Sequence, residues 1–198
     1  VYEYWDGLVD LLANDLRWVS LCTNGTLIEK RLESLAPISS HLEVSVSIDG
    51  FEKEHDSLRG RGTFRRTMNG LKVLVEQKKR NSFLGEITVN CVISDEMVGQ
   101  MFEFVQILEE QGVETVYVSF PWYISAETSG KMDRYYDEHF SWNPREGKPS
   151  WHSYNFRLDP NLVDQLNAAV ARIDAAKWRL KLRYNPRLDA DDMRPFIM

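Results

Sequence analysis

The sequence predicts an α/β fold built around a parallel sheet. Helical and strand-like segments alternate along residues 4–120, and each unit takes roughly thirty to forty residues, a length typical of βα units rather than of a solenoid. Strict alternation is what right-handed crossovers between parallel strands require. With 198 residues, 43% of them apolar, the chain can bury a real core and is expected to form one domain or a large part of one.

Alternation and capping signals define the elements of the first half. A capping box is expected at Thr26, because Glu29 stands three residues later. Gly50 follows a strand in which apolar and polar side chains alternate, and a long loop is expected from there through residue 62. In order, we expect a helix over 4–14, a strand over 17–22, a helix over 26–35, a strand over 42–48 and a helix over 63–80.

The second half continues the pattern after one interruption. Ser94 is expected to cap a helix that Gly112 ends, Asp159 with Pro160 to start another, and Asp189 to cap the beginning of a last one. These signals predict a strand over 85–93, a helix over 96–111, a strand over 114–120, a helix over 159–176 and an edge strand over 178–184.

The interruption covers residues 122–157, where periodicity fails and aromatic side chains crowd together. A connection this long and this aromatic predicts either a lid or partner-facing layer, or a subdomain that packs on the sheet. Its aromatic residues are Trp122, Tyr123, Tyr135, Tyr136, Phe140, Trp142, Trp151, Tyr154 and Phe156.

Composition excludes several classes of protein. A formal net charge of -6 disfavours nucleic acid as a partner, since phosphate binding needs a basic face. No stretch approaches the roughly twenty apolar residues of a membrane span, and no signal-peptide pattern is seen, so we expect a cytoplasmic protein. Cys22 and Cys91 stand alone in apolar runs; they predict small buried hydrophobes rather than a disulfide or a metal site.

Polar residues recur where the predicted strands end. Thr23-Asn24-Gly25, Ser47 with Asp49, residues 90–94 and residues 119–122 all occupy such positions, where ligand groups gather in parallel sheets. Arg59 is the natural fork for a ligand carboxylate. The alternatives are a polar βα loop with a surface arginine, and a simple tight turn at Asn24-Gly25.

The histidines do not suggest chemistry of their own. His55 and Asp56 are expected to order a loop, because no nucleophile is spaced to use the imidazole. His41, His139 and His152 lack the spacing of metal ligands, and surface or lid positions are expected for them. Dinucleotide and Walker loops, a nucleophile elbow and HExxH are all missing from the sequence.

Four motifs in order resemble the radical S-adenosylmethionine (radical SAM) superfamily, in particular its peptide- and protein-modifying branch with a cysteine-rich SPASM extension. These motifs are Thr23-Asn-Gly25 after a strand, Val46-Ser-Ile-Asp-Gly50, His55-Asp-x-x-Arg59-Gly60 and Gly62-Thr-Phe64 at a helix start. The resemblance covers residues 4–121 well and the Tyr184-Asn-Pro186 region more loosely. It implies a partial, open (β/α) barrel with parallel strands and outer helices.

The resemblance also implies cofactors and roles. A four-iron, four-sulfur (4Fe-4S) cluster would cleave S-adenosylmethionine to a 5′-deoxyadenosyl radical, with an electron donor such as a flavodoxin or ferredoxin and a peptide or small-molecule substrate. Ser47 and Arg59 would hold the methionyl carboxylate, and Asp49 would order the loop or approach the polar edge of the site. The remaining expected cofactor-binding residues are Thr23 and Asn24 beside them, Asn90, and the backbone near Val92 at the adenine.

Two motifs of the family are not found in the sequence: the CxxxCxxC that holds the cluster and the Gly-Gly-Glu turn that binds the cofactor's amino group. We therefore expect a fragment whose cluster ligands lie outside it and which is inactive alone. The expected parts are the central barrel (1–121), an aromatic insertion or lid (122–158) and a last helix–strand unit leading into an extension (159–198). The alternatives are a cluster-free barrel module that binds a peptide or small zwitterion, and a sugar- or phosphate-processing barrel enzyme.

Overall fold

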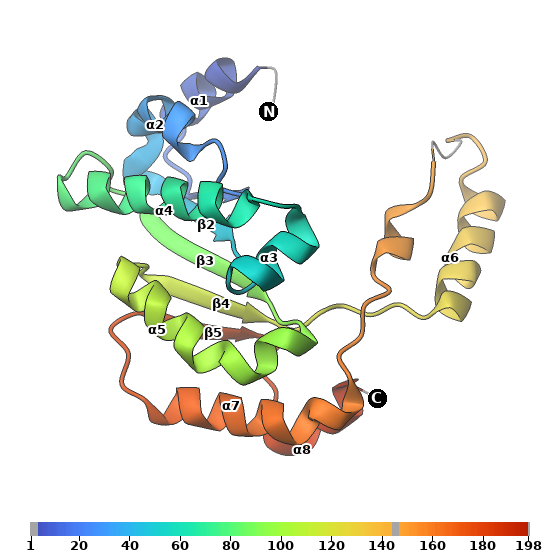
Figure 1. Ribbon diagram of the computed structural model, residues 1–198. Helices are drawn as coiled ribbons and strands as arrows, with labels where there is room; N and C mark the ends of the chain where they lie inside the picture. Colours follow the sequence, from blue (N-terminus) through green and yellow to red (C-terminus); the bar gives the residue numbers. More distant parts are fainter. Residues whose placement is uncertain (1–3, 144–146, 198) are drawn as a thin grey trace.

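The computed structural model describes residues 4–143 and 147–197. Residues 1–3, 144–146 and 198, which the three predicted parts include, lie outside this description. The described chain contains a sheet of five parallel strands, and their order across the sheet is their order in the sequence (Figure 1). The predicted parallel sheet is confirmed.

The strands end nearly level with one another. In the register of the sheet, Ser47 is paired with Asn90, Val92 with Ser119, and Ser119 with Asn185. The carboxyl ends of four neighbouring strands therefore form a single edge. The strands are β1 (Val19–Thr23), β2 (Leu42–Ser47), β3 (Glu86–Val92), β4 (Thr115–Ser119) and β5 (Lys181–Asn185), and β5 is at the sheet edge as predicted.

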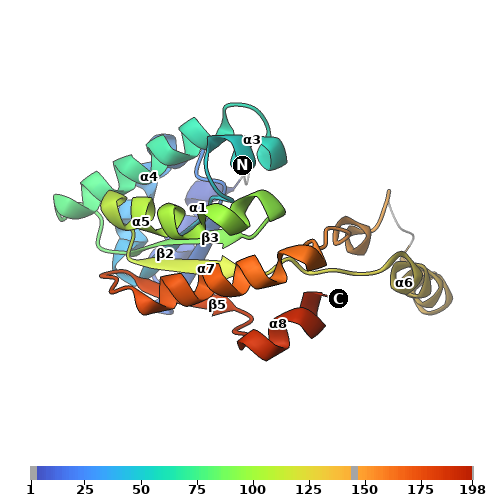
Figure 2. The same ribbon diagram turned by 60° about the horizontal axis from the view of Figure 1, so that its bottom comes forward.

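Helices α4, α5 and α7 run along the same face of the sheet (Figures 1 and 2). The helices are α1 (Trp5–Ala13), α2 (Ile28–Leu35), α3 (Glu52–Arg59), α4 (Thr63–Lys79), α5 (Met101–Gln111), α6 (Ala126–His139), α7 (Val163–Ala175) and α8 (Ala190–Ile197). Short 3-10 turns are η1 (Ala36–His41), η2 (Asp95–Gln100), η3 (Ser150–Ser153) and η4 (Pro160–Leu162).

The two faces of the sheet differ in chemistry because side chains alternate along each strand. The helix-covered face is apolar, and its strand residues, such as Val44 and Val89, are fully buried. On the other face, Glu43 accepts hydrogen bonds from Ser20 Oγ (2.9 Å) and Thr88 Oγ1 (2.8 Å). Polar side chains thus lie across this second face and reach the edge where the strands end.

The expected long loop after β2 is wrong, because residues 52–59 form helix α3. Glu52 and Glu54 lie in its first turn and Arg59 in its last, which is the charge distribution that the helix dipole favours. Phe51, just before the helix, packs edge-on against Phe104 with ring centroids 5.6 Å apart. Arg59 is therefore carried by a helix rather than by a loop.

Two predicted helix caps are also wrong. Helix α2 begins after Leu27 without a side-chain cap. Thr26 Oγ1 donates to Asn24 Oδ1 (2.9 Å) instead, and Glu29 accepts a hydrogen bond from Asn69 Nδ2 (3.0 Å). Local turn contacts and a tertiary contact have replaced the capping box.

Near β3, the hydroxyl of Ser94 caps nothing, and η2 precedes α5. The predicted cap at Asp159 is confirmed, since its carboxylate accepts from Asn161 N (2.9 Å). Gly112 ends α5 with φ of 93°, as predicted. None of the helices within the described ranges has the length and apolar character that crossing a membrane takes.

The aromatic segment forms an arm. Helix α6 stands away from the sheet, and the chain returns beside it through η3 (Figures 1 and 2). At the root of the arm, Ile124 N donates to Tyr154 O (2.7 Å), so the outgoing and returning segments are joined where they leave the sheet. Further along the return, Asp159 N donates to Asp95 Oδ1 (2.9 Å). The root is thereby fixed on the main body.

Candidate functional site

A cavity of about 910 Å³ opens where strands β2 to β5 end. It lies on the polar face of the sheet, and the root of the aromatic arm forms one side of it. A volume of this size accommodates a cofactor-sized ligand. Its lining residues are Asp49, Leu58, Arg59, Asn90, Val92, Ile93, Ser94, Ser119, Phe120, Pro121, Trp122, Ser153, Tyr154, Phe156 and Asn185.

Asp49 connects three elements at the cavity wall. Its side chain is 5% exposed, and Oδ1 accepts a hydrogen bond from Val92 N at the end of β3 (3.0 Å). Its other oxygen, Oδ2, accepts from Arg59 Nε at the end of α3 (2.5 Å). The carboxylate therefore ties β2, β3 and α3 together through charge-assisted hydrogen bonds.

Arg59 is held by one edge only. Its side chain is 33% exposed, and only Nε bonds to Asp49. Among the described residues, the two terminal guanidinium nitrogens have no hydrogen-bond or ion-pair partner. Because Arg presents five donors in a planar fork, these nitrogens remain available to an anionic group in the cavity.

His55 supports this wall from behind. It is fully buried, and its Nδ1 accepts a hydrogen bond from Asp49 N (3.2 Å), which leaves the ring proton on Nε2. Burial lowers the pKa of His55, and the nearby Asp49 carboxylate opposes that shift only in part. The imidazole is therefore neutral, and its role is structural.

Asp56 organises the turn between α3 and α4. Its carboxylate accepts from Gly62 N (2.5 Å), Phe64 N (2.8 Å) and Thr63 Oγ1 (3.2 Å). The hydrogen bonds from Phe64 and Gly62 lower the pKa of Asp56. The predicted ordering role of His55 and Asp56 is confirmed.

Comparison with known proteins decides the family. The family model described as the radical SAM superfamily matches residues 2–105, more than half of the 198-residue chain. The chain belongs to the radical SAM superfamily. A curated relative, mycofactocin maturase MftC of Mycolicibacterium smegmatis, is 26% identical over 111 residues, which are 56% of this chain and 27% of MftC.

Two solved structures share the fold. SuiB of Streptococcus suis bound to S-adenosylmethionine aligns with a TM-score of 0.60 at 15% identity, over 96% of this chain and 38% of SuiB. Native anSMEcpe with bound AdoMet and the Cp18Cys peptide aligns with a TM-score of 0.52 at 18% identity, over 92% of this chain and 46% of anSMEcpe. This chain thus spans between about a quarter and a half of these relatives, and the predicted partial barrel is confirmed as its fold.

The radical SAM site residues expected from the sequence fall into two groups. Asp49, Arg59, Asn90 and Val92 line the large cavity together. Ser47 is paired with Asn90 in the sheet but is not among the lining residues.

Thr23 and Asn24 line a separate hollow of about 400 Å³ beside α2. In the turn after β1, Thr23 Oγ1 accepts from Gly25 N (3.1 Å) and Asn24 Oδ1 from Thr26 N (3.2 Å). Both side chains therefore stabilise their own turn.

Five residues of the cavity, among them Leu58 and Ser153, escaped the sequence analysis as site residues. Asn185 ends β5, and the rule that ligand groups follow parallel strands would have found it. Tyr154 and Phe156 were visible only as members of the aromatic segment, because no periodicity indicates which aromatic residues return to the sheet.

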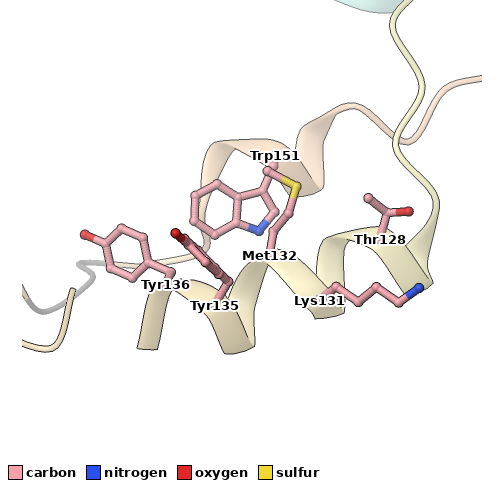
Figure 3. Close-up of a pocket in the computed structure, with 6 residues that line it drawn as sticks. All are labelled: Thr128, Lys131, Met132, Tyr135, Tyr136 and Trp151. Carbon is pink, nitrogen blue, oxygen red and sulfur yellow. The ribbon is translucent and has the colours of Figure 1, made fainter. Parts of the chain in front are cut away.

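A second hollow, of about 390 Å³, lies on the arm itself (Figure 3). Trp151 lies over α6 beside Met132 and Tyr135, and its indole Nε1 donates to Asp133 Oδ1 (3.1 Å). Among the described lining residues Lys131 alone is charged, and it forms an ion pair with Glu127 (2.7 Å). The described lining is mainly aromatic and apolar surface between α6 and η3, which is typical of a packing feature.

Of the two cofactors expected for a radical SAM protein, the described residues fit S-adenosylmethionine but not an iron–sulfur cluster. Residues 4–143 and 147–197 contain no group of three or more His, Cys, Asp or Glu side chains arranged to hold a metal ion. Cys91 is buried on the helix-covered face, and its pKa is raised by burial. Cys22 is exposed, which corrects the expectation that it is buried. The described residues therefore supply no set of ligands for an iron–sulfur cluster.

S-adenosylmethionine does fit the described residues. The free fork of Arg59 suits its carboxylate. Asn90 and Ser119 bring amide and hydroxyl groups to the same cavity, and Ser119 Oγ donates to Asn90 Oδ1 (2.9 Å). Since no partner is seen for Asn90 Nδ2 within the described ranges, that amide can donate to a ligand.

Proposed function

We propose that the cavity at the ends of β2 to β5 binds S-adenosylmethionine and that the protein uses it to modify a peptide. The observation that carries this proposal is the half-engaged Arg59, whose Nε is held by buried Asp49 while its terminal nitrogens have no partner among the described residues. A fixed cationic fork at a cavity of about 910 Å³ suits the carboxylate of an amino-acid-bearing cofactor.

The other residues have supporting roles in this proposal. Arg59 holds the methionyl carboxylate, Asn90 donates to the polar part of the cofactor, and the backbone near Val92 contacts the adenine. Ser47, which does not line the cavity, supports this wall through its pairing with Asn90 in the sheet. Thr23 and Asn24 shape the first βα turn beside the site. These roles agree with the hydrogen-bonding capacity of each group.

Membership of the radical SAM superfamily supports the reaction class. When bound and reductively cleaved, S-adenosylmethionine supplies a 5′-deoxyadenosyl radical that abstracts hydrogen from a substrate. The residues of this chain contribute binding and orientation of the cofactor. The reductant is a protein such as a flavodoxin or ferredoxin. A peptide is the proposed substrate because MftC is a maturase and anSMEcpe has been solved with a peptide.

The binding test uses S-adenosylhomocysteine, which carries the same carboxylate and adenosine, in calorimetric titrations of the chain. Arg59→Ala is expected to weaken binding by about 2–5 kcal/mol, or roughly thirty-fold to several thousand-fold. Arg65→Ala is the matched control, since Arg65 pairs with Glu52 at the surface (2.9 Å) and is expected to change nothing. Equal affinity for wild type and Arg59→Ala would remove Arg59 from the site.

The reaction itself is tested by supplying iron, sulfide and reductant to the full-length protein and measuring 5′-deoxyadenosine. Formation of this product, with oxygen-sensitive brown absorbance, supports the enzyme. Binding of the cofactor without either signal would favour the cluster-free binding module instead.

A further inference from the structure

An aromatic wall stands at one side of the cavity, and its residues have no role in the cofactor assignment above. It consists of Trp122, Tyr154 and Phe156, which are 66%, 41% and 40% exposed. Trp122 and Tyr154 have ring centroids 6.0 Å apart, at an interplanar angle of 38°. Three neighbouring rings open to a cavity provide apolar surface that a ligand can cover.

The local structure aims these rings. Along the outgoing segment, Trp122 lines the cavity while Tyr123 faces the other way, where its ring lies 5.5 Å from the Arg157 guanidinium carbon. On the returning segment, Tyr154 and Phe156 line the cavity and Arg157 does not. Trp122 and Tyr123 therefore lie on different sides of the outgoing segment, and Phe156 and Arg157 lie on different sides of the returning one.

Hydrogen bonds at the root of the arm hold that arrangement. Ile124 N donates to Tyr154 O (2.7 Å), which joins the two segments next to the rings. Arg157 Nε donates to Ile197 O of α8 (2.6 Å), and Leu158 is buried. The wall therefore belongs to the main body rather than to the projecting part of the arm.

The charge of the lining selects what the wall can bind. Among the described residues, Asp49 and Arg59 are the only charged ones that line the cavity, and they pair with each other. An acidic ligand group beside the rings would lose water and meet only the electronegative ring faces, which is costly, whereas a basic group can gain a cation–π contact. An uncharged apolar group loses nothing of this kind and gains contact with the rings.

A polar group next to the wall suits a peptide backbone. Asn185 lines the cavity from the end of β5, and its side-chain amide has no partner within residues 4–143 and 147–197. One carboxamide can donate to a peptide carbonyl and accept from a peptide N–H. The site thus combines a backbone anchor with an apolar side-chain surface.

We propose that Trp122, Tyr154 and Phe156 form a subsite for an aromatic or large aliphatic side chain of the substrate peptide, with Asn185 on the peptide backbone. This inference rests on the proposed function. It specifies the class of substrate side chain that the enzyme would hold beside its cofactor. It also predicts that acidic residues are rejected at this position.

The test is an NMR titration of the 198-residue chain with three capped tripeptides, acetyl-Gly-X-Gly-amide, in which X is Phe, Leu or Asp. The Trp122 indole resonance is assigned by its loss in Trp122→Ala. The Phe and Leu peptides are expected to shift this resonance and to bind about tenfold more tightly than the Asp peptide. Trp122→Ala is expected to weaken binding of the Phe peptide about five- to tenfold.

Tyr123→Ala is the matched control, because it removes an exposed aromatic ring one position away that faces Arg157. It is expected to leave the affinity for the Phe peptide within about twofold, and circular dichroism checks that both variants fold alike. Equal binding of acidic and apolar peptides would overturn the subsite. So would an unchanged affinity in Trp122→Ala.

Titration with S-adenosylhomocysteine separates this inference from the proposed function. If the cofactor analogue binds and the peptides show no preference, only the subsite fails. If the analogue does not bind at all, the proposed function fails, whatever the peptides do.

Discussion

Asp49→Ala tests whether one carboxylate joins the three elements of the cavity wall. The change leaves the Val92 N–H without its acceptor, which costs about 1–3 kcal/mol for a buried donor. It also removes the partner of Arg59, but water reaches that side chain, so this loss is only about 0.5–1 kcal/mol. The free energy of unfolding is expected to fall by about 1.5–4 kcal/mol in total.

Asp49→Asn separates the two contributions. The Asn side chain keeps an oxygen for Val92 N–H but turns an amide toward Arg59 Nε, so we expect a loss of about 1–2 kcal/mol. The assay is urea unfolding followed by circular dichroism. Glu52→Gln, which breaks an ion pair at the surface, is the control and is expected to cost less than about 0.5 kcal/mol. The reasoning fails if Asn costs as much as Ala, or if Ala costs no more than the control.

Two further predictions concern packing and pH. Gly70→Ala is expected to lower the free energy of unfolding by about 1–3 kcal/mol, because the new methyl group would overlap the backbone oxygen of Gly25 between α4 and α2. Gly7→Ala, in helix α1 with open space around it, is expected to stabilise by about 0.5–1 kcal/mol; urea unfolding of both variants checks the contrast, and an equal effect would contradict it. Burial lowers the pKa of His55 below its usual 6.5, so over a range of pH below 6.5 the imidazole is protonated in the unfolded chain but neutral in the folded chain. The free energy of unfolding therefore has its full value above pH 6.5 and falls as the pH drops below it, by at most about 1.4 kcal/mol per pH unit. His55→Gln keeps an acceptor for Asp49 N but does not titrate, so unfolding curves between pH 7.5 and 5.5 are expected to fall less steeply for this variant; parallel slopes would exclude His55 as the source.

Regular alternation made the sheet predictable from sequence. In β2, residues such as Val44 and Val46 are fully buried while Ser47 is only partly buried. The alternation of apolar and polar residues in the sequence predicts this burial pattern. Helix α3 was missed because its eight residues, Glu52–Arg59, offer mostly charged side chains and almost no apolar periodicity. What fixes it is tertiary contact, through buried His55 and Phe51, and such contacts leave no local signal.

The same distinction applies to the candidate site. Asp49 and Arg59 are ten positions apart, so one strand and the turn after it were enough to bring them to one place in the prediction. Asn185 and Tyr154 reach the cavity from far along the chain, after an arm that has no periodic pattern. Thr23 and Asn24 were expected beside Arg59 because every strand end was treated as equivalent, but β1 is an edge strand whose end borders a different hollow.

The charge of the Asp49–Arg59 pair restricts which ligand the cavity can favour. The two side chains cancel, so a simple carboxylate that binds the free edge of Arg59 leaves one uncompensated negative charge beside a buried carboxylate. A ligand that brings its own cation avoids this cost. S-adenosylmethionine carries an ammonium and a sulfonium beside its carboxylate, so its ammonium alone offsets the carboxylate and its sulfonium leaves the ligand with one net positive charge. Because Asp49 occupies its other edge, Arg59 is better suited to a zwitterionic or cationic amino acid than to a ligand that carries only a carboxylate.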